Sequence, residues 1–278
     1  MSAEPYDSPN GLTIADLSPA DFAVHETAPG VTAEFDVSTD RAPDGSPCAS
    51  YTAERAASGG PWAKISRTFS PYADVSGRQA LGVWVCGDGQ GELLSFQWGN
   101  PSYVIRGRGD RFVVADFTGW RYFELIEPEG ERIAEYSWPS GAHAYDIYRE
   151  GVSFAHVDSL SIWYNNLPEG KKVACCLSPV RALPLAKGKL RNPAIKVGDQ
   201  AITFPVEIES GQYLEFRSLT DCKLYGEKGE LLREVRPEGP VPVLEPGDNP
   251  IVFECNAVPE APDPRARVTL ISQGEPLK

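Results

Sequence analysis

Apolar residues fall in short runs between positions 79 and 126, and turn-forming residues separate these runs. The first two runs, 81–86 and 93–98, are joined by the sequence GDGQG. Asp-Gly supplies the positive φ that a tight turn requires, so this pair predicts a β-hairpin. Two further runs, 112–117 and 120–126, flank the dipeptide Thr118-Gly119. We therefore expect four strands of one antiparallel sheet in this part of the chain.

The predicted strands have two different faces, because side chains alternate along a strand. One face is aliphatic, with Leu81, Val83 and Val85 in the first strand, and predicts the core. The opposite face places aromatic rings beside hydrogen-bonding groups, which suits a sugar ring with its apolar C–H patches and its hydroxyls. The alternative is that these rings form a second core layer under an opposing sheet. The residues predicted to bind carbohydrate are Trp84, Ser95, Gln97, Trp120, Tyr122, Glu124 and Trp163.

Strand-like segments continue on both sides of this region, and together they make about ten strands, which is typical of a jelly roll. We expect a polar arm over residues 1–20 and a jelly-roll β-sandwich over residues 21–183. The additional segments are 31–37, 48–54, 62–69, 133–138, 145–148, 157–164 and 172–177.

A second, smaller unit is predicted after a linker at residues 184–193, where prolines flank a basic, glycine-containing stretch. Residues 194–278 contain seven short runs, the spacing of an immunoglobulin-like β-sandwich. Cys222 and Cys255 lie in two of these runs, which leaves open whether they pair or remain free thiols. The seven runs are 195–197, 201–208, 212–219, 222–225, 231–235, 249–256 and 267–272.

Composition supports an all-β protein and excludes several partners. The 26 glycines and 25 prolines fit many turns, and no apolar stretch is long enough to predict a membrane span. The net charge of −13 argues against nucleic acid, which needs a basic patch. No Cys/His spacing indicates zinc. The polar first residues do not have the pattern of a signal peptide, so secretion is not indicated directly.

The sequences GVWVCGDGQGELLSFQW and VVADFTGWRYFEL resemble the galactose-binding-like jelly-roll domains, which include carbohydrate-binding modules. The C-terminal sequences SGQYLEF, DCKLYGEKGE and EPGDNPIVFEC resemble small sandwich domains appended to bacterial glycoside hydrolases and polysaccharide lyases. This resemblance implies an extracellular or periplasmic location and a catalytic domain upstream in the same polypeptide. The matching jelly-roll positions are Gly82, Trp84, Gly87, Asp88, Gly89, Gly91, Leu94, Asp116, Phe117, Gly119 and Trp120.

The same resemblance implies a structural calcium ion between loops at one edge of the sandwich, because Ca²⁺ prefers carboxylate and carbonyl oxygens. The candidate ligands are Glu34, Asp36, Asp116 and Asp158. The alternative is that acids such as Asp88 and Asp116 cap turns through their own backbone.

A catalytic function is the alternative to carbohydrate binding. Jelly-roll lyases use a Tyr or His base near an Arg, and His143, Tyr145 and Arg149 lie close together in the sequence. No nucleophile-elbow, zinc-protease or phosphate-loop motif occurs in the required context.

We therefore expect a noncatalytic carbohydrate-binding accessory region of a bacterial glycoside hydrolase or polysaccharide lyase. A jelly-roll lyase or hydrolase is the first alternative, and a structural spacer or protein-docking module is the second.

Overall fold

The computed structural model describes residues 2–22, 24–101, 107–126 and 152–256, together with Ala266, Val268 and Thr269. Two compact units divide the chain: an N-terminal unit, Ala3–Leu185, and a C-terminal unit, Met1–Ser2 with Ala186–Lys278. Nearly all of the described regular structure is β-strand, which confirms the predicted all-β fold class; the one described helix is the 3-10 turn η1 (Pro19–Asp21). Among these residues, no helix is long and apolar enough to cross a membrane.

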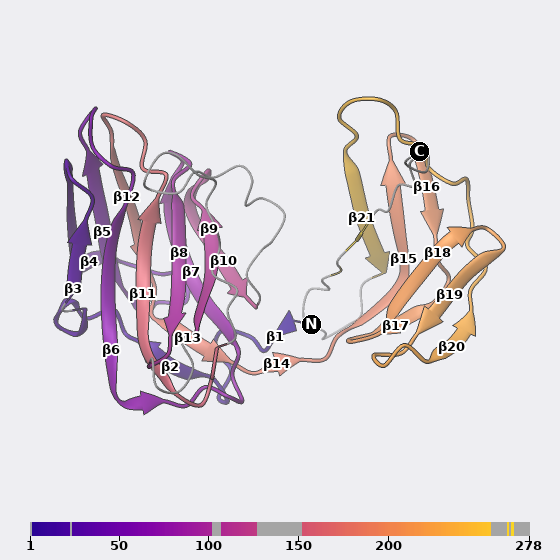
Figure 1. Cartoon of the computed structure of the whole chain (residues 1–278), viewed down its shortest axis with the longest axis horizontal. Coiled ribbons are helices and arrows are strands. Elements are labelled where there is room, and N and C mark those ends of the chain that lie inside the picture. Colours follow the sequence, from indigo (N-terminus) through magenta and orange to yellow (C-terminus); the bar gives the residue numbers. More distant parts are fainter. Residues whose placement is uncertain are drawn as a thin grey trace, which may run out of the picture. The chain divides into compact units, whose positions relative to one another are not determined.

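The N-terminal unit is a jelly-roll β-sandwich whose described part contains two antiparallel sheets (Figure 1). The seven-stranded sheet has the order β2 (Leu12–Ala15), β13 (Val180–Leu183), β7 (Ala80–Asp88), β12 (Lys172–Leu177), β5 (Pro47–Arg55) and β4 (Val31–Arg41), with β10 (Thr118–Leu125) also paired to β7. The five-stranded sheet has the order β3 (Val24–Thr27), β6 (Ala63–Ala73), β11 (Val157–Asn165), β8 (Leu93–Gly99) and β9 (Arg108–Val114). β1 (Ser2–Ala3) pairs with β14 (Leu185–Ala186) in a separate short ribbon.

The chain crosses from one sheet to the other between β7 and β8, so the predicted hairpin is wrong. β7 pairs with β10 along the whole length of β10, while β8 pairs with β9 and β11. The Asp88 carboxylate holds the start of the crossing, because it accepts hydrogen bonds from the N–H groups of Gln90 at 3.0 Å and Ala174 at 2.7 Å. The four central strands therefore belong to two layers rather than to one sheet.

The main core lies between these two layers. Leu81, Val83 and Val85 of β7 are fully buried, as predicted, and they face inward with Phe96 and Trp98 of β8. Burial of this kind is worth about 1.5–3 kcal/mol for each large apolar side chain. Trp98 is thus a core residue and is not available to a ligand.

Within the predicted polar arm, residues from Ala3 onward contact the sandwich. β2 pairs with β13 at the edge of the seven-stranded sheet. The Arg181 guanidinium donates to the carbonyl of Ser8 at 2.9 Å, and Ala3 N–H donates to the Glu124 carboxylate at 3.2 Å. This segment is therefore part of the N-terminal unit from Ala3 onward.

Close packing between β7 and β10 depends on Gly87. A Cβ at this position would lie 2.6 Å from the backbone carbonyl oxygen of Phe117, and this oxygen cannot move away without shifting strand β10. We expect Gly87→Ala to lower the free energy of unfolding by about 1–3 kcal/mol in urea titrations followed by tryptophan fluorescence. Gly77→Ala is the matched control, because its Cβ meets no atom within 4 Å. Equal losses in both variants would contradict this prediction.

The C-terminal unit contains two small antiparallel sheets in its described part. One has the order β16 (Gln200–Thr203), β15 (Lys189–Val197) and β17 (Glu207–Glu209), with β21 (Ile251–Asn256) also paired to β15; the other has the order β18 (Tyr213–Ser218), β19 (Asp221–Tyr225) and β20 (Leu231–Glu234). Cys222 on β19 and Cys255 on β21 are free thiols in different sheets. The immunoglobulin-like arrangement stays a prediction, and most of the expected strand at 267–272 lies outside the described residues.

Candidate functional site

The outer face of the seven-stranded sheet gathers four of the predicted binding residues. Tyr122 lies opposite Trp84, Trp120 lies opposite Cys86, and Glu124 follows on the same side of β10. All four predicted residues are half-buried, so their side chains remain accessible to solvent. The ring centroids of Trp84 and Tyr122 are 5.3 Å apart, at an interplanar angle of 44°. We call this surface the aromatic face and define it by Tyr6, Trp84, Trp120 and Tyr122.

Tyr6 belongs to the aromatic face and comes from the N-terminal segment. The alternation of side chains along the predicted strands did not identify this residue. Its ring lies edge-on to Tyr122, with centroids 5.8 Å apart. Gly82 makes room for this contact, because a Cβ there would lie 2.9 Å from the Tyr122 hydroxyl and 3.2 Å from the Tyr6 ring. The Arg181 guanidinium lies 5.6 Å from the Tyr6 centroid and adds a cation–π contact. Three parts of the chain that are distant in sequence thus build one surface.

Ser178 holds the centre of the aromatic face in place. Its Oγ is fully buried and accepts a hydrogen bond from the backbone N–H of Trp84 at 2.9 Å. The Tyr6 hydroxyl donates to the Pro179 carbonyl at 2.7 Å and contacts Ser178 Oγ at 3.1 Å. Burial raises the pKa of Tyr6, so its hydroxyl stays a donor through the neutral range.

Removing the Ser178 hydroxyl should destabilise the aromatic face. We expect Ser178→Ala to cost about 1–3 kcal/mol of unfolding free energy, because the buried N–H of Trp84 loses its acceptor. The measurement is urea denaturation of the full chain. Ser50→Ala serves as the control, since Ser50 lies half-buried on the same sheet face and makes no side-chain hydrogen bond within the described residues. A loss for Ser50→Ala as large as that for Ser178→Ala would count against this role.

A row of short side chains extends the aromatic face across the sheet. Cys86 lies opposite Cys176, which lies opposite Ser50, and Trp120 and Asp36 continue the row to the outer strands. The row crosses five strands and spans about 19 Å at the usual strand spacing. Burial raises the pKa of Cys86, so this thiol stays uncharged at neutral pH. The face therefore offers aromatic rings at one end and small polar groups along its length.

Ser95, Gln97 and Trp163 do not lie on the aromatic face, contrary to the prediction. They face outward from the five-stranded sheet, because β8 and β11 belong to that layer. Ser95 and Gln97 are buried and donate to the Asp110 carboxylate at 3.3 and 2.8 Å. These two residues hold the sheet together rather than face a ligand.

Trp163 belongs to a separate aromatic pair on the five-stranded sheet. Its ring lies 5.5 Å from that of Trp62 at an angle of 55°. The Lys64 ammonium covers Trp163 at 5.0 Å from the ring centroid and forms an ion pair with Glu26 at 3.0 Å. Because neighbouring side chains already occupy its ring, Trp163 is a weaker ligand candidate than Trp120.

The expected calcium ligands do not gather at one place. Glu34 and Asp36 lie on β4 in the seven-stranded sheet, Asp116 follows β9, and Asp158 lies on β11. Across the described ranges, no three His, Cys, Asp or Glu side chains are arranged to hold a metal ion. The four candidate ligands therefore do not form one site together, and the calcium ion itself stays a prediction. The alternative catalytic residues His143, Tyr145 and Arg149 lie outside the described residues.

No protein-family model and no curated protein sequence matches the chain. Among solved structures, it is similar to a family 11 carbohydrate-binding module of a cellulosomal cellulase of Clostridium thermocellum, with 11% identity and a TM-score of 0.44 over 65% of this chain and 97% of that one. An exo-β-agarase is similar at 9% identity and a TM-score of 0.42, over 63% of this chain and 25% of that chain. A carbohydrate-binding module of the β-sandwich superfamily matches at 10% identity and a TM-score of 0.38, over 62% and 61%. The structures it resembles are thus carbohydrate-binding modules and a glycoside hydrolase, at a similarity too distant to assign a function to this chain.

Proposed function

We propose that the N-terminal unit binds a polysaccharide on its aromatic face, as a noncatalytic region of a bacterial polysaccharide-degrading enzyme. The observation that carries this proposal is the set of half-buried rings on one sheet face, Tyr6, Trp84, Trp120 and Tyr122, beside a row of small polar groups. Sugar rings pack on such aromatic surfaces through their C–H groups while their hydroxyls bond to neighbouring polar atoms. In this role the chain would work outside the cytoplasm, next to a catalytic domain of the same polypeptide.

Charge on this face favours an uncharged glycan. Glu34 and Asp36 are exposed on β4 at the end of the face opposite the rings. Glu54 on β5 is exposed on the same face, opposite Lys172 on β12. Arg181 already donates to the carbonyl of Ser8 and covers Tyr6. Among the described residues, carboxylates thus outnumber basic groups on this face, so a uronate or sulfated chain would meet a net negative charge, and like charges brought together cost affinity.

Affinity electrophoresis of the full chain tests the proposal. Gels containing β-glucan, xylan, mannan, galactan or pectin are compared with a gel without polysaccharide, and tryptophan fluorescence is titrated with the same polymers. We expect retardation in at least one neutral polymer, with a fluorescence change, and none in pectin. Full mobility in every gel together with unchanged fluorescence would refute binding. Release of new reducing ends or of unsaturated products would instead make the chain an enzyme.

A further inference from the structure

Cys86 and Cys176 lie directly opposite each other on two neighbouring strands. Cys86 is on β7, Cys176 is on β12, and the two residues are Cα partners in the antiparallel pairing of these strands. The residues beside them, Val85 and Leu177, are fully buried in the core, so both thiols lie on the outer face of the sheet. Both thiols are free and half-buried. The fold therefore brings together two cysteines that are far apart in the sequence.

The separation of these two residues suits a disulfide bond. The Ser178 N–H donates to the Trp84 carbonyl at 3.0 Å, which makes this a hydrogen-bonded pair. Pair types alternate along an antiparallel ladder, so the cysteine pair two residues away is of the same type, with Cα atoms about 5.5 Å apart. Disulfides most often join Cα atoms about 5.5–6 Å apart. The opposed Cβ atoms, about 4.5–5.5 Å apart in a sheet, need to approach by about 1 Å.

We propose that Cys86 and Cys176 form a cross-strand disulfide when the chain meets a small disulfide oxidant such as oxidised glutathione. One cysteine thiolate attacks a sulfur of the oxidant and releases one glutathione thiolate, which takes up a proton. The second cysteine thiolate then attacks the cysteine sulfur of this mixed disulfide and releases the other glutathione. The chain loses two hydrogens, the oxidant gains them, and one S–S bond replaces another.

The two thiols are free to turn toward each other but are not strongly acidic. Cys176 Sγ makes a weak contact with Ser38 Oγ at 3.8 Å, which a rotation of the cysteine side chain gives up at little cost. Burial raises the pKa of the Cys86 thiol, and negative charge at Cys176 and Asp40 raises it further. Because the thiolate is the attacking species, the bond forms most readily above neutral pH.

Cys48, the third thiol on this face, lies farther from both partners. Cys176 is opposite Ser50 on β5, and Cys48 is two residues along the same strand, a diagonal separation of about 7–8 Å. β12 separates β5 from β7, so Cys48 lies about two strand spacings, roughly 10 Å, from Cys86. These separations exceed the Cα distances of disulfides. The Cys48 thiol also donates to the Asp40 carbonyl at 2.9 Å.

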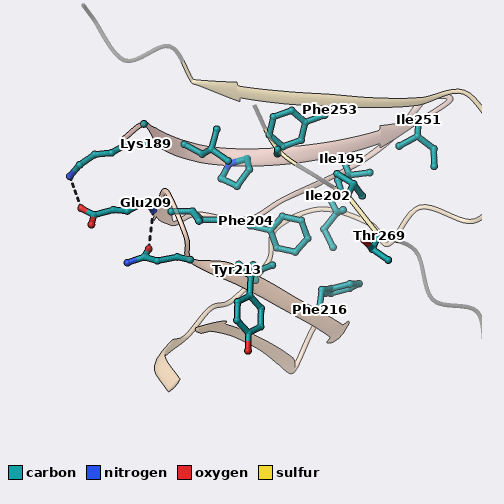
Figure 2. A pocket seen from close by; sticks show the side chains of 18 of the residues that line it. Lys189, Ile195, Ile202, Phe204, Glu209, Tyr213, Phe216, Ile251, Phe253 and Thr269 are labelled. Atoms are coloured by element: carbon teal, nitrogen blue, oxygen red, sulfur yellow. Dashed lines mark hydrogen bonds and ion pairs between the residues drawn. The ribbon is translucent and has the colours of Figure 1, made fainter. Parts of the chain in front are cut away.

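The remaining three cysteines, all among the described residues, are not placed to join this pair or each other. Cys175 is 2% exposed and points into the core of the N-terminal unit. Cys222 and Cys255 lie on the two different sheets of the C-terminal unit. Figure 2 shows the apolar side chains that line the groove between these sheets, with Phe216 from one sheet and Phe253 from the other. Facing sheets pack about 10 Å apart, which is too far for a disulfide.

Oxidation of the folded full chain by excess oxidised glutathione at about pH 9 tests the proposal. The mass of the chain should fall by that of two hydrogens, and two of the six cysteines should escape labelling by iodoacetamide after denaturation. The tryptic peptides 79–106 and 173–181 should be joined, and fragmentation between Cys175 and Cys176 assigns the bond. Near-ultraviolet circular dichroism shows that the chain stays folded during the reaction.

Two serine variants identify the partners. Cys176→Ser should abolish the cross-link, whereas Cys48→Ser, which removes the third thiol of the same face, should leave it intact. Cys86→Ala should also abolish it, and takes the place of Cys176→Ser if that variant does not fold. Six labelled cysteines in the oxidised, folded chain, a cross-link through Cys48 or Cys175, or glutathione that stays attached to either partner would overturn the proposal. The readout is a mass, so it does not depend on carbohydrate binding.

Discussion

Trp120→Ala is expected to weaken polysaccharide binding about tenfold or more in affinity electrophoresis and isothermal titration. Trp120 lies on β10 at the edge of the seven-stranded sheet, and it is half-buried opposite Cys86. Loss of one stacking ring removes its buried apolar area and the geometric part of the interaction, and about 1.4 kcal/mol already corresponds to a factor of ten. Because Trp120 is not part of the Trp84–Tyr122–Tyr6 contact, the fold should tolerate its removal.

Trp163→Ala is the matched control, because it removes the same side chain from the outer face of the other sheet. It should leave the affinity within about twofold of the unchanged chain. Equal loss in both variants would mean that binding does not occur on the aromatic face, and loss in Trp163→Ala alone would move the site to the five-stranded sheet. Urea titrations of both variants show whether either change in affinity comes from unfolding.

The local pattern of apolar and polar residues predicted the positions of these strands and the faces of their side chains. The run 81–86 lies within β7 and the run 93–98 within β8, and the aliphatic residues of β7 face the core as alternation requires. The same local pattern did not predict which strands pair with each other. A turn rich in Asp and Gly fits a hairpin and equally a crossing between layers, and only the distant partners of β7, namely β10, β12 and β13, decide which occurs.

The error at the candidate site follows directly from this pairing. Alternation places Ser95 and Gln97 on the polar side of β8, which is correct, but the pairing puts β8 in the other layer. The polar sides of β7 and β8 therefore face away from each other. Tyr6 and Ser178 were missed for a related reason, because both reach the aromatic face through contacts that span more than 80 residues of sequence. Sequence patterns gave the faces of strands but not the surface that they form together.

A carboxylate in the core of the N-terminal unit should make its stability depend on pH. Glu92 precedes β8, has no exposed surface, and its carboxylate oxygens accept no hydrogen bond from another residue within the described part of the chain. Burial raises the pKa of Glu92 from 4.5 to about 7; its own backbone N–H opposes this in part, and the negative charge of Asp88 adds to it. Asp88, Tyr164 and Cys175 are titratable groups close to it, and burial raises the pKa of Tyr164 and Cys175 above the neutral range. Glu92 is thus the buried group of this cluster whose pKa lies near neutral pH.

Glu92→Gln is expected to stabilise the N-terminal unit by about 2–3 kcal/mol at pH 8 and to have almost no effect at pH 4. The folded state favours the protonated carboxyl, so its full stability is present below pH 4.5 and is lost as the pH rises to about 7. One pKa unit equals about 1.4 kcal/mol, and the amide stays neutral throughout, which removes this loss. Tryptophan-monitored thermal unfolding should show a midpoint raised by about 5–10 °C at pH 8.

Glu34→Gln, at an exposed position of β4, is the control, and it should show no such dependence on pH. A Glu92→Gln effect of equal size at both pH values, or a loss of stability at pH 8, would mean that the buried carboxyl is not the group that titrates.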